Sequence, residues 1–298
     1  MRVGCRLPVE RRLPVERRLP VGVHVQVSGG LIKAARHARS LRCECLQIFA
    51  RNARGWRART YRDDEIAGFR EILASRDISP LVIHSCYLVN LASPDRELRD
   101  RSLSSVADDM ARAHLLGGRF VVFHFGHHMG AGRDRALRTV AHGIRLLLAG
   151  APDGVSLLLE NSAGRGSELG GDWQDFTLLL DLLGGDSRVG VCFDTCHAHA
   201  AGYRLDSARW VGRALRGFDS AVGLARLRLI HLNDCRAPAG SHIDHHQHIG
   251  RGTIGDAGFR ALLHRRALRH RCAILETPIQ RRGDDRRNLR RVWALRQG

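Results

Sequence analysis

The chain has 298 residues and a formal net charge of +18, with a pI of about 11.1. No apolar run approaches the ~20 residues that a membrane-spanning helix needs. The charged, proline-interrupted N-terminus does not resemble a secretory signal. We therefore expect no membrane partner and a cytoplasmic protein.

Arginine carries almost all of the positive charge, because Lys33 is the only lysine. A strongly basic domain usually binds a polyanion, and nucleic acid is the first partner to consider. The alternative explanation of this charge is a GC-rich genome whose codons favour arginine in all its proteins. None of the eight cysteines forms a C-x-x-C pair. A four-cysteine zinc module is therefore not expected, and we interpret the cysteines as reduced thiols.

The N-terminal segment contains a six-residue repeat, since residues 7–21 read LPVERRLPVERRLPV. A proline every six residues prevents a helix, and the repeat has few side chains to bury. We predict a disordered arm over residues 1–20 and a single catalytic domain over residues 21–298. A basic DNA-binding arm is the alternative interpretation of the repeat.

Beyond the arm, short apolar runs alternate with helical patterns. The runs predict buried strands over residues 21–27, 45–50, 81–85, 120–125, 155–161, 189–195, 227–234 and 272–278. Helices are expected over residues 30–41, 63–76, 95–116, 136–150, 173–183, 208–218, 256–265 and 286–296. This uninterrupted series predicts a (β/α)₈ TIM barrel of the α/β class. A doubly wound open sheet is the alternative, but no G-x-G-x-x-G follows the first strand.

Most of the predicted strands end in a residue that can bind a metal: His84, His124, Glu160, Asp194, His231 and Glu276. His197 follows three residues after Asp194, and the loop SHIDHHQH supplies Asp244 and His246. The C-terminal strand ends of a parallel barrel converge on the face that carries the chemistry. Nine ligands with one shared carboxylate suit a cluster of two or three metals, as in phosphoryl transfer. Taken singly, these residues have simpler roles, such as helix caps for Glu160 or Asp194.

Seven segments, in order from residue 22 to about residue 280, match one known family. They are GVHVQVSGGL (22–31), QIFARNARGW (47–56), HSCYLVNLASP (84–94), LENSAGRGSELG (159–170), VGVCFDTCHAHAAGY (189–203), IHLNDCRAPAGSHIDHHQHIGRGTIG (230–255) and ILETP (274–278). DTCHAHAAGY, HLND and ILETP together are highly specific. The chain thus resembles the endonuclease IV family of zinc-dependent apurinic/apyrimidinic endonucleases.

This resemblance implies a TIM barrel that holds three zinc ions. The implied ligand sets are His84, His124 and Glu160 for the first zinc, Glu160, Asp194, His231 and Glu276 for the second, and His197, Asp244 and His246 for the third. Glu160, as the bridging carboxylate, is the expected catalytic residue. The ligand types leave open whether manganese replaces zinc at some positions.

The resemblance also implies a reaction and a partner. The family hydrolyses double-stranded DNA on the 5′ side of an abasic site, leaving a 3′-hydroxyl, and removes blocking groups from 3′ ends. Arg54, Tyr87 and Leu88 match residues that enter the DNA helix and hold the abasic nucleotide outside it. We therefore expect a DNA-repair hydrolase that acts as a monomer.

Three departures from the family pattern affect residues beside the expected ligands. The family's HPG is His124-Phe125-Gly126, its Asp-Arg-His is Asp244-His245-His246, and its Gly-Glu-Gly is Gly250-Arg251-Gly252. None removes a ligand, but the second removes a basic side chain and the third reverses a charge.

Two other function classes are open at this point: a metal-dependent sugar isomerase or epimerase on a related barrel, and a catalytically silent DNA-binding barrel. Such an isomerase site generally needs only one or two metals. The Asp244-x-His246 pair and the expected insertion residues favour the nuclease over the isomerase, and the intact ligands argue against the silent barrel.

Overall fold

The computed structural model describes residues 18–297. Eight strands close into a barrel in the order β1-β10-β7-β6-β5-β4-β3-β2, and all neighbouring pairs are parallel. Their bounds are β1 (Val21–Val25), β2 (Leu46–Phe49), β3 (Leu81–His84), β4 (Phe120–His124), β5 (Ser156–Glu160), β6 (Val189–Asp194), β7 (Leu227–His231) and β10 (Cys272–Leu275). The predicted (β/α)₈ TIM barrel is confirmed.

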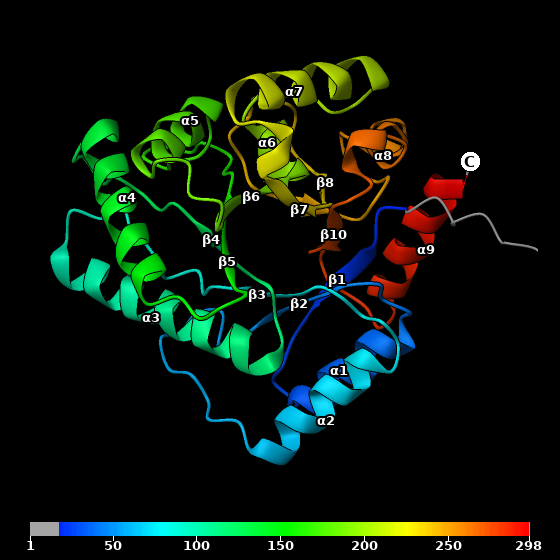
Figure 1. The fold of residues 1–298 in the computed structure, drawn as a ribbon. Helices are drawn as coiled ribbons and strands as arrows, with labels where there is room; N and C mark the ends of the chain where they lie inside the picture. The colour runs from blue at the N-terminus through cyan, green and yellow to red at the C-terminus, as the bar shows by residue number, and fades with distance from the viewer. Residues whose placement is uncertain (1–17, 298) are drawn as a thin grey trace, which may run out of the picture.

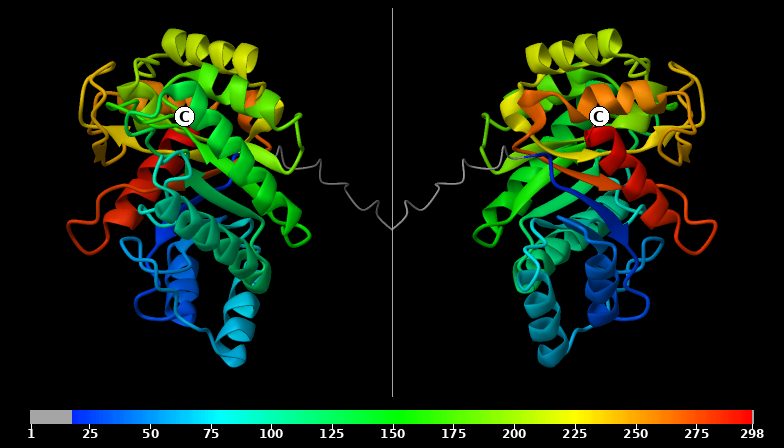
Figure 2. Two further views of the ribbon diagram at one scale, coloured as in Figure 1. Left: turned by 90° about the vertical axis from the view of Figure 1, so that its left-hand side faces the viewer. Right: turned by 90° about the vertical axis from the view of Figure 1, so that its right-hand side faces the viewer.

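Helices surround the barrel on its outside (Figure 1). They are α1 (Leu31–Ser40), α2 (Asp63–Ala74), α3 (Arg96–Leu116), α4 (Arg133–Ala149), α5 (Trp173–Leu182), α6 (Thr195–Ala200), α7 (Ala208–Ala221), α8 (Gly255–Leu263) and α9 (Asp284–Gln297), with 3₁₀ turns η1 (Leu224–Arg226) and η2 (Arg266–Leu268). The helices α2 and α7 lie on opposite sides of the barrel in all three views (Figures 1 and 2). Within residues 18–297, no helix combines the length and hydropathy needed to cross a bilayer.

The alternation of side chains along each strand decides what fills the barrel. On β5, Leu157 and Leu159 belong to the large core between the strands and the helices, whereas Leu158 belongs to a second, smaller core. That second core fills the barrel interior and consists of Cys45, Val82, Phe120, Val122, Leu158, Cys192, Leu229, Cys272 and Ile274. The barrel is therefore packed rather than open, and its chemistry is confined to its two mouths.

Local signals set the limits of the long helices. The helix α3 begins after Asp95, whose carboxylate accepts a hydrogen bond from the Glu97 backbone N–H at 2.9 Å. It ends at Gly117, whose φ of 77° is the left-handed conformation that glycine adopts at low cost. These caps explain why the predicted bounds of α3 agree with the structure within about a residue.

The unpredicted short elements include, besides the two 3₁₀ turns, the helix α6 and the two-stranded antiparallel sheet of β8 (Asp234–Cys235) and β9 (His246–Gln247). Six residues in α6 and two in each strand are too few for a periodic pattern to be visible. The helix α6 begins because Asp194 accepts a hydrogen bond from the His197 backbone N–H at 2.7 Å. These elements matter because they carry His197 and His246.

The predicted disordered arm lies, as far as residue 17, outside the described residues. Leu19 is described and is only 2% exposed, and its carbonyl accepts a hydrogen bond from Arg296 Nη1 at 3.0 Å. The packing of the barrel thus begins two residues before the predicted domain boundary at residue 21.

Candidate metal centre

Each barrel strand contributes one polar side chain to the C-terminal mouth, either from within the strand or, for Glu276, from the residue that follows it. Six are the residues that the sequence indicated, and the other two are His24 on β1 and Gln47 on β2. The alternation explains the arrangement, because each of the six follows an interior apolar residue by two positions, as Glu160 follows Leu158. The C-terminal mouth is therefore lined by polar side chains above an apolar interior.

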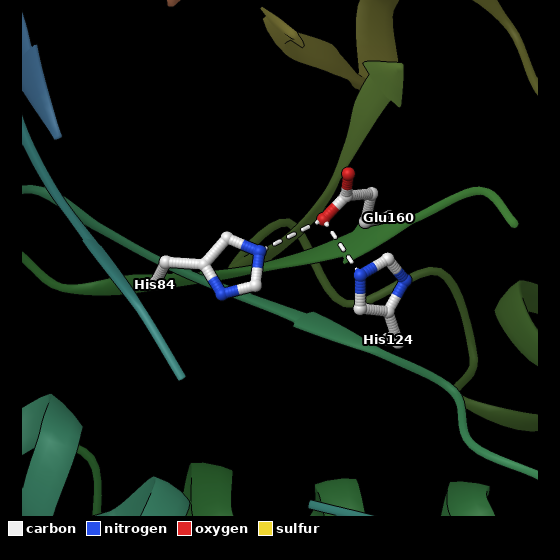
Figure 3. A group of neighbouring side chains, drawn as sticks. All are labelled: His84, His124 and Glu160. Carbon is white, nitrogen blue, oxygen red and sulfur yellow. Dashed lines mark hydrogen bonds and ion pairs between the residues drawn. The ribbon is translucent and has the colours of Figure 1, made fainter. Parts of the chain in front are cut away.

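Glu160 lies at the centre of this mouth and is fully buried. Its Oε2 atom lies 3.1 Å from His84 Nε2 and 3.4 Å from His124 Nε2, as the dashed lines in Figure 3 show. Its other oxygen, Oε1, lies 2.8 Å from His231 Nδ1 and 3.5 Å from His197 Nδ1. The two oxygens of one carboxylate thus face two separate pairs of imidazoles, which is the arrangement that a bridging carboxylate requires.

A second group forms around His231 Nδ1. This atom lies 3.2 Å from Glu276 Oε2 and 4.0 Å from Asp194 Oδ2, in addition to its contact with Glu160. Three carboxylates from β5, β6 and the end of β10 therefore converge on one imidazole nitrogen. The sequence-predicted residues Asp194, His231 and Glu276 are thus brought together with Glu160.

A third group combines the short helix α6 with the loop between β8 and β9. Asp244 Oδ1 lies 3.2 Å from His197 Nε2 and 3.4 Å from His246 Nε2. Asp194 Oδ2 lies 3.7 Å from His246 Nε2, which links this group to the second one. The structure therefore brings all nine sequence-predicted ligand residues to one mouth, in three adjoining groups.

The electrostatics of the mouth favour positive charge. Burial alone would raise the pKa of the Glu160 carboxyl, but His124 and His231 outweigh it and hold the pKa well below its usual range. Burial alone would lower the pKa of His197, but the charges of Asp194 and Asp244 raise it well above its usual value. The carboxylates thus remain ionised, and their negative charge attracts a cation, either a proton on a neighbouring imidazole or a metal ion.

One buried atom tests whether a metal fits this donor set. His246 Nε2 is buried and makes no hydrogen bond, although it faces the carboxylates of Asp194 and Asp244. A buried polar atom without a hydrogen-bond partner is costly and rare in folded proteins, and a metal between these groups would give it one. The ligand atoms of His84, His124 and Glu160 also lie within 4.8 Å of one another. Imidazole and carboxylate together form a donor set that zinc accepts, so the residues fit a metal.

Sequence reasoning missed the residues that hold the ligands in place. Gln47 is fully buried, its Oε1 lies 2.8 Å from His231 Nε2, and its Nε2 donates to Glu276 Oε1 at 2.6 Å. The Nδ1 atom of His24 lies 3.0 Å from the same carboxylate oxygen. The signal was present in the sequence, because His24 and Gln47 are polar residues inside otherwise apolar strands.

Asn233 performs a similar task beside β7. Its amide nitrogen donates to Asp194 Oδ2 at 2.6 Å, and its Oδ1 accepts a hydrogen bond from the Glu276 backbone N–H at 2.7 Å. Two expected ligands from different strands are therefore oriented by one buried amide. Such hydrogen bonds to ligands fix their orientation and tune the metal that they bind.

The expected DNA-insertion residues lie at the rim of the same mouth. Tyr87 is 60% exposed and Leu88 is 36% exposed, which is unusual for large apolar side chains beside a cavity. Arg54 is exposed on the neighbouring loop, and the Tyr87 backbone N–H ties the two loops together by donating to Ala53 O at 2.9 Å. A cavity of about 500 Å³ extends from Tyr87 and Leu88 to residues His124, His197 and Asp244.

The three departures from the family pattern have different consequences. Phe125 is fully buried and packs edge-on against Phe176 at 4.8 Å between ring centroids, so this change affects packing. His245 is exposed between two expected ligands, and Arg251 is exposed beside a separate cavity of about 310 Å³ that also contains Arg287. None of these three residues displaces an expected ligand.

Comparison with known proteins places this centre in a family. A family model described as the xylose isomerase-like TIM barrel matches residues 35–294. The probable endonuclease 4 of Methanoculleus marisnigri is 42% identical over 277 residues, which cover 92% of this chain and 98% of that protein. The probable endonuclease 4 of Halothermothrix orenii is 37% identical over 257 residues, covering 86% and 92% of the two chains.

Solved structures agree with the sequence relatives. Endonuclease IV from Thermus thermophilus superposes with a TM-score of 0.82 at 36% identity, covering 93% of this chain and 99% of that one. A D-tagatose 3-epimerase-like protein superposes with a TM-score of 0.71 at 18% identity over 94% and 98% of the two chains, and this likeness concerns the fold alone. With 42% identity to a relative across nearly the whole of both chains, the protein belongs to the endonuclease IV family within the xylose isomerase-like TIM barrels.

Proposed function

We propose that the protein repairs DNA by hydrolysing the phosphodiester on the 5′ side of abasic sites in double-stranded DNA, which leaves a 3′-hydroxyl, and by trimming blocked 3′ ends. The observation that carries this proposal is the central position of Glu160, whose two oxygens each face two imidazoles within 3.5 Å. An isomerase site with one or two metals would leave the third group, His197, Asp244 and His246, without a role. The family relationship supports the same reaction class.

Nine side chains would hold three zinc ions, or manganese at some positions. The proposed sets are His84, His124 and Glu160, then Glu160, Asp194, His231 and Glu276, and finally His197, Asp244 and His246. When bound, such a cluster makes a water nucleophilic near pH 7 and stabilises the attacking and leaving oxygens of an in-line displacement.

The chain's own residues orient this chemistry. Glu160 holds two ligand sets at a fixed separation, because its carboxylate is fully buried and contacts an imidazole at each oxygen. Gln47 directs His231 by lying 2.8 Å from its Nε2 atom, which leaves Nδ1 facing the carboxylates. Asp244 is exposed and closes the mouth on the side of the DNA-facing cavity.

Lesion recognition depends on the exposed rim. Removing a nucleotide from the stack costs a few kcal/mol, and the cost is lowest where the base is already missing. Side chains that enter the helix offset this cost by replacing lost stacking. Tyr87 and Leu88 have the exposure that this role needs, and Arg54 adds a cation on the adjoining loop. The cavity of about 500 Å³ beside them provides a path for the extruded sugar-phosphate to reach His124 and Asp244.

We further infer that one chain suffices for activity and that it works in the cytoplasm. All nine proposed ligands come from one chain, so the centre needs no residue from a second copy. The seven described cysteines are free, as expected of a protein in a reducing compartment.

The decisive experiment offers the purified chain a duplex with one abasic site, end-labelled on the lesion strand, and separately a panel of ketohexoses. We expect incision that leaves a 3′-hydroxyl end, which a DNA polymerase can extend directly. An undamaged duplex of the same sequence is the substrate control, and Glu160→Gln is the protein control. Epimerisation of a sugar without incision of the abasic duplex would overturn the proposal.

A further inference from the structure

The opposite mouth of the barrel contains a further cavity, of about 370 Å³. It lies where the N-terminal ends of β1, β3, β4, β7 and β10 meet, so the packed barrel interior separates it from the metal centre. Phe120 and Cys272 form an apolar part of its wall, and its basic lining consists of Arg18, Arg119, Arg228, Arg269, His270 and Arg271. Its volume falls within the range of small-ligand clefts, which is about 300–1,000 Å³.

The charge of this cavity is unbalanced. Among the described residues, no aspartate or glutamate lines it. Within residues 18–297, the buried Nε atom of Arg271 has no hydrogen-bond partner, although its Nη2 donates to Leu224 O at 2.7 Å. Burial and the nearby charge of Arg228 lower the pKa of Arg271. The guanidinium groups therefore repel one another, and one of their donors lacks an acceptor.

Binding of backbone carbonyls, an ordinary role of arginine at this end of a barrel, accounts for other residues but only in part for Arg271 and not for Arg119 or Arg228. Arg188 Nη1 donates to Leu148 O at 2.8 Å, at the C-terminal end of α4, and Arg226 binds three carbonyls between residues 185 and 189. By contrast, within residues 18–297 the guanidinium of Arg228 makes no hydrogen bond or ion pair, although the Arg228 carbonyl accepts a hydrogen bond from Cys272 Sγ at 3.8 Å. The guanidinium of Arg119 lies over the Phe120 ring at 5.8 Å. Both are left available to a ligand.

We propose that this cavity binds a phosphate monoester dianion, held by Arg119, Arg228 and Arg271. A guanidinium presents a planar fork of donors that matches phosphate oxygens, and such charge-assisted pairs are stronger than neutral hydrogen bonds. A bound dianion would relieve the repulsion between Arg228 and Arg271 and supply an acceptor for the buried Nε. The apolar wall at Phe120 offers a surface for the organic part of a nucleotide.

Calorimetric titration of the zinc-loaded full-length protein tests this site, with inorganic phosphate and dAMP as the probes. The double variant Arg119→Ser/Arg228→Ser should bind one equivalent fewer than the wild type, or bind that equivalent at least about tenfold more weakly, because two charge-assisted pairs are lost. The matched control is Arg36→Ser/Arg290→Ser, which removes two exposed arginines from α1 and α9 and should titrate as the wild type does.

The metal centre can also bind phosphate, so inhibition of abasic-site incision by dAMP is measured in parallel. That inhibition should be the same in all three proteins, since the front mouth is unchanged. Tighter binding of dAMP than of phosphate would identify a nucleotide as the preferred ligand, and equal binding would identify the phosphate group alone. The proposal is overturned if the double variant titrates like the wild type, or if the control loses as much binding, which would indicate a general charge effect.

Discussion

The two mouths of the barrel are built by the same strands but differ in how their charges are balanced. At the C-terminal mouth, the carboxylates of Glu160, Asp194 and Glu276 all lie within 4.0 Å of an imidazole nitrogen. At the N-terminal mouth, Arg228 and Arg271 share a cavity that no described carboxylate lines. The first mouth is suited to cations and the second to anions. The local pairing of charges therefore distinguishes the two sites, whereas the overall charge of +18 does not.

Metal removal should have the largest effect, and only at the C-terminal mouth. We expect about three zinc equivalents per chain, since nine ligands with one shared suit roughly four ligands per zinc once waters are included. Chelation should abolish incision and lower the melting temperature, because a bound metal stabilises the folded state by mass action. Elemental analysis measures the zinc content, a cleavage assay measures incision, and thermal unfolding measures the melting temperature. Added zinc should restore all three quantities. A fully active protein with one metal would contradict the cluster.

The Glu160→Gln substitution should have the second-largest effect on incision. The substitution keeps the shape of the side chain but removes the charge that both imidazole pairs face, so we expect a loss of incision on the order of 10³-fold. The barrel should remain folded by circular dichroism, and the metal content should fall. Glu97→Gln, on the exposed surface of α3, is the matched control and should retain full activity. Near-normal incision by Glu160→Gln would remove this residue from the mechanism.

The Gln47→Leu substitution should lower the metal affinity of the centre without removing a proposed ligand. The leucine cannot hold His231 Nε2 or the Glu276 carboxylate, and the loss of such a positioning group costs about 10- to 100-fold in metal affinity or activity. Zinc affinity by competition with a chromogenic chelator is the measurement, with exposed Gln174→Leu as the control. Gln47→Glu keeps the acceptor for His231 and should recover part of the affinity. Equal affinity in all four proteins would assign Gln47 to packing alone.

Tyr87→Ala tests the rim of the C-terminal mouth. Loss of an aromatic stacking surface should weaken binding of an abasic duplex by about 1–2 kcal/mol, or roughly 5- to 30-fold. Metal content and melting temperature should change little, because the side chain is 60% exposed. Binding of a frayed 3′ end needs less unstacking, so the affinity of Tyr87→Ala for this substrate should fall less. The control variant Tyr87→Phe should behave as the wild type. Equal losses on both substrates would mean that Tyr87 does not stabilise the extruded state.

Substitutions at the N-terminal mouth should have the smallest effect on DNA binding and incision. The affinity for an abasic duplex should fall with salt with a slope of about −0.9 per neutralised phosphate. Arg119→Ser/Arg228→Ser should leave that slope and the incision rate unchanged within about twofold, because duplex DNA on the metal centre cannot reach the opposite end of a packed barrel. Measuring Kd across a salt series would check this. A shallower slope in the variant would show that both mouths contact the same DNA.

The sequence by itself determined the barrel and indicated most of the proposed metal centre. Strand-length apolar runs alternate with helical patterns, and side chains on a strand alternate with a period of two, so a polar residue two positions after an interior one must face the mouth. This local rule indicated His84, His124, Glu160, Asp194, His231 and Glu276 before any contact was known. It would also have indicated His24 and Gln47, which were not included because neither ends its apolar run.

Only the tertiary structure decided which residues from distant segments share one space. Asp244 and His246 reach the third group because the β8–β9 pairing folds their loop over α6, and two-residue strands have no periodicity to read. Asn233 and Gln47 act by bridging residues from other strands, so their roles depend on partners up to 229 residues away. The arginines that line the cavity of the N-terminal mouth lie at positions 18, 119, 228, 269 and 271, and whole strand–helix units separate all but the last two. Barrel closure brings them together, because the packing that closes the sheet is a property of the whole chain and not of any single segment.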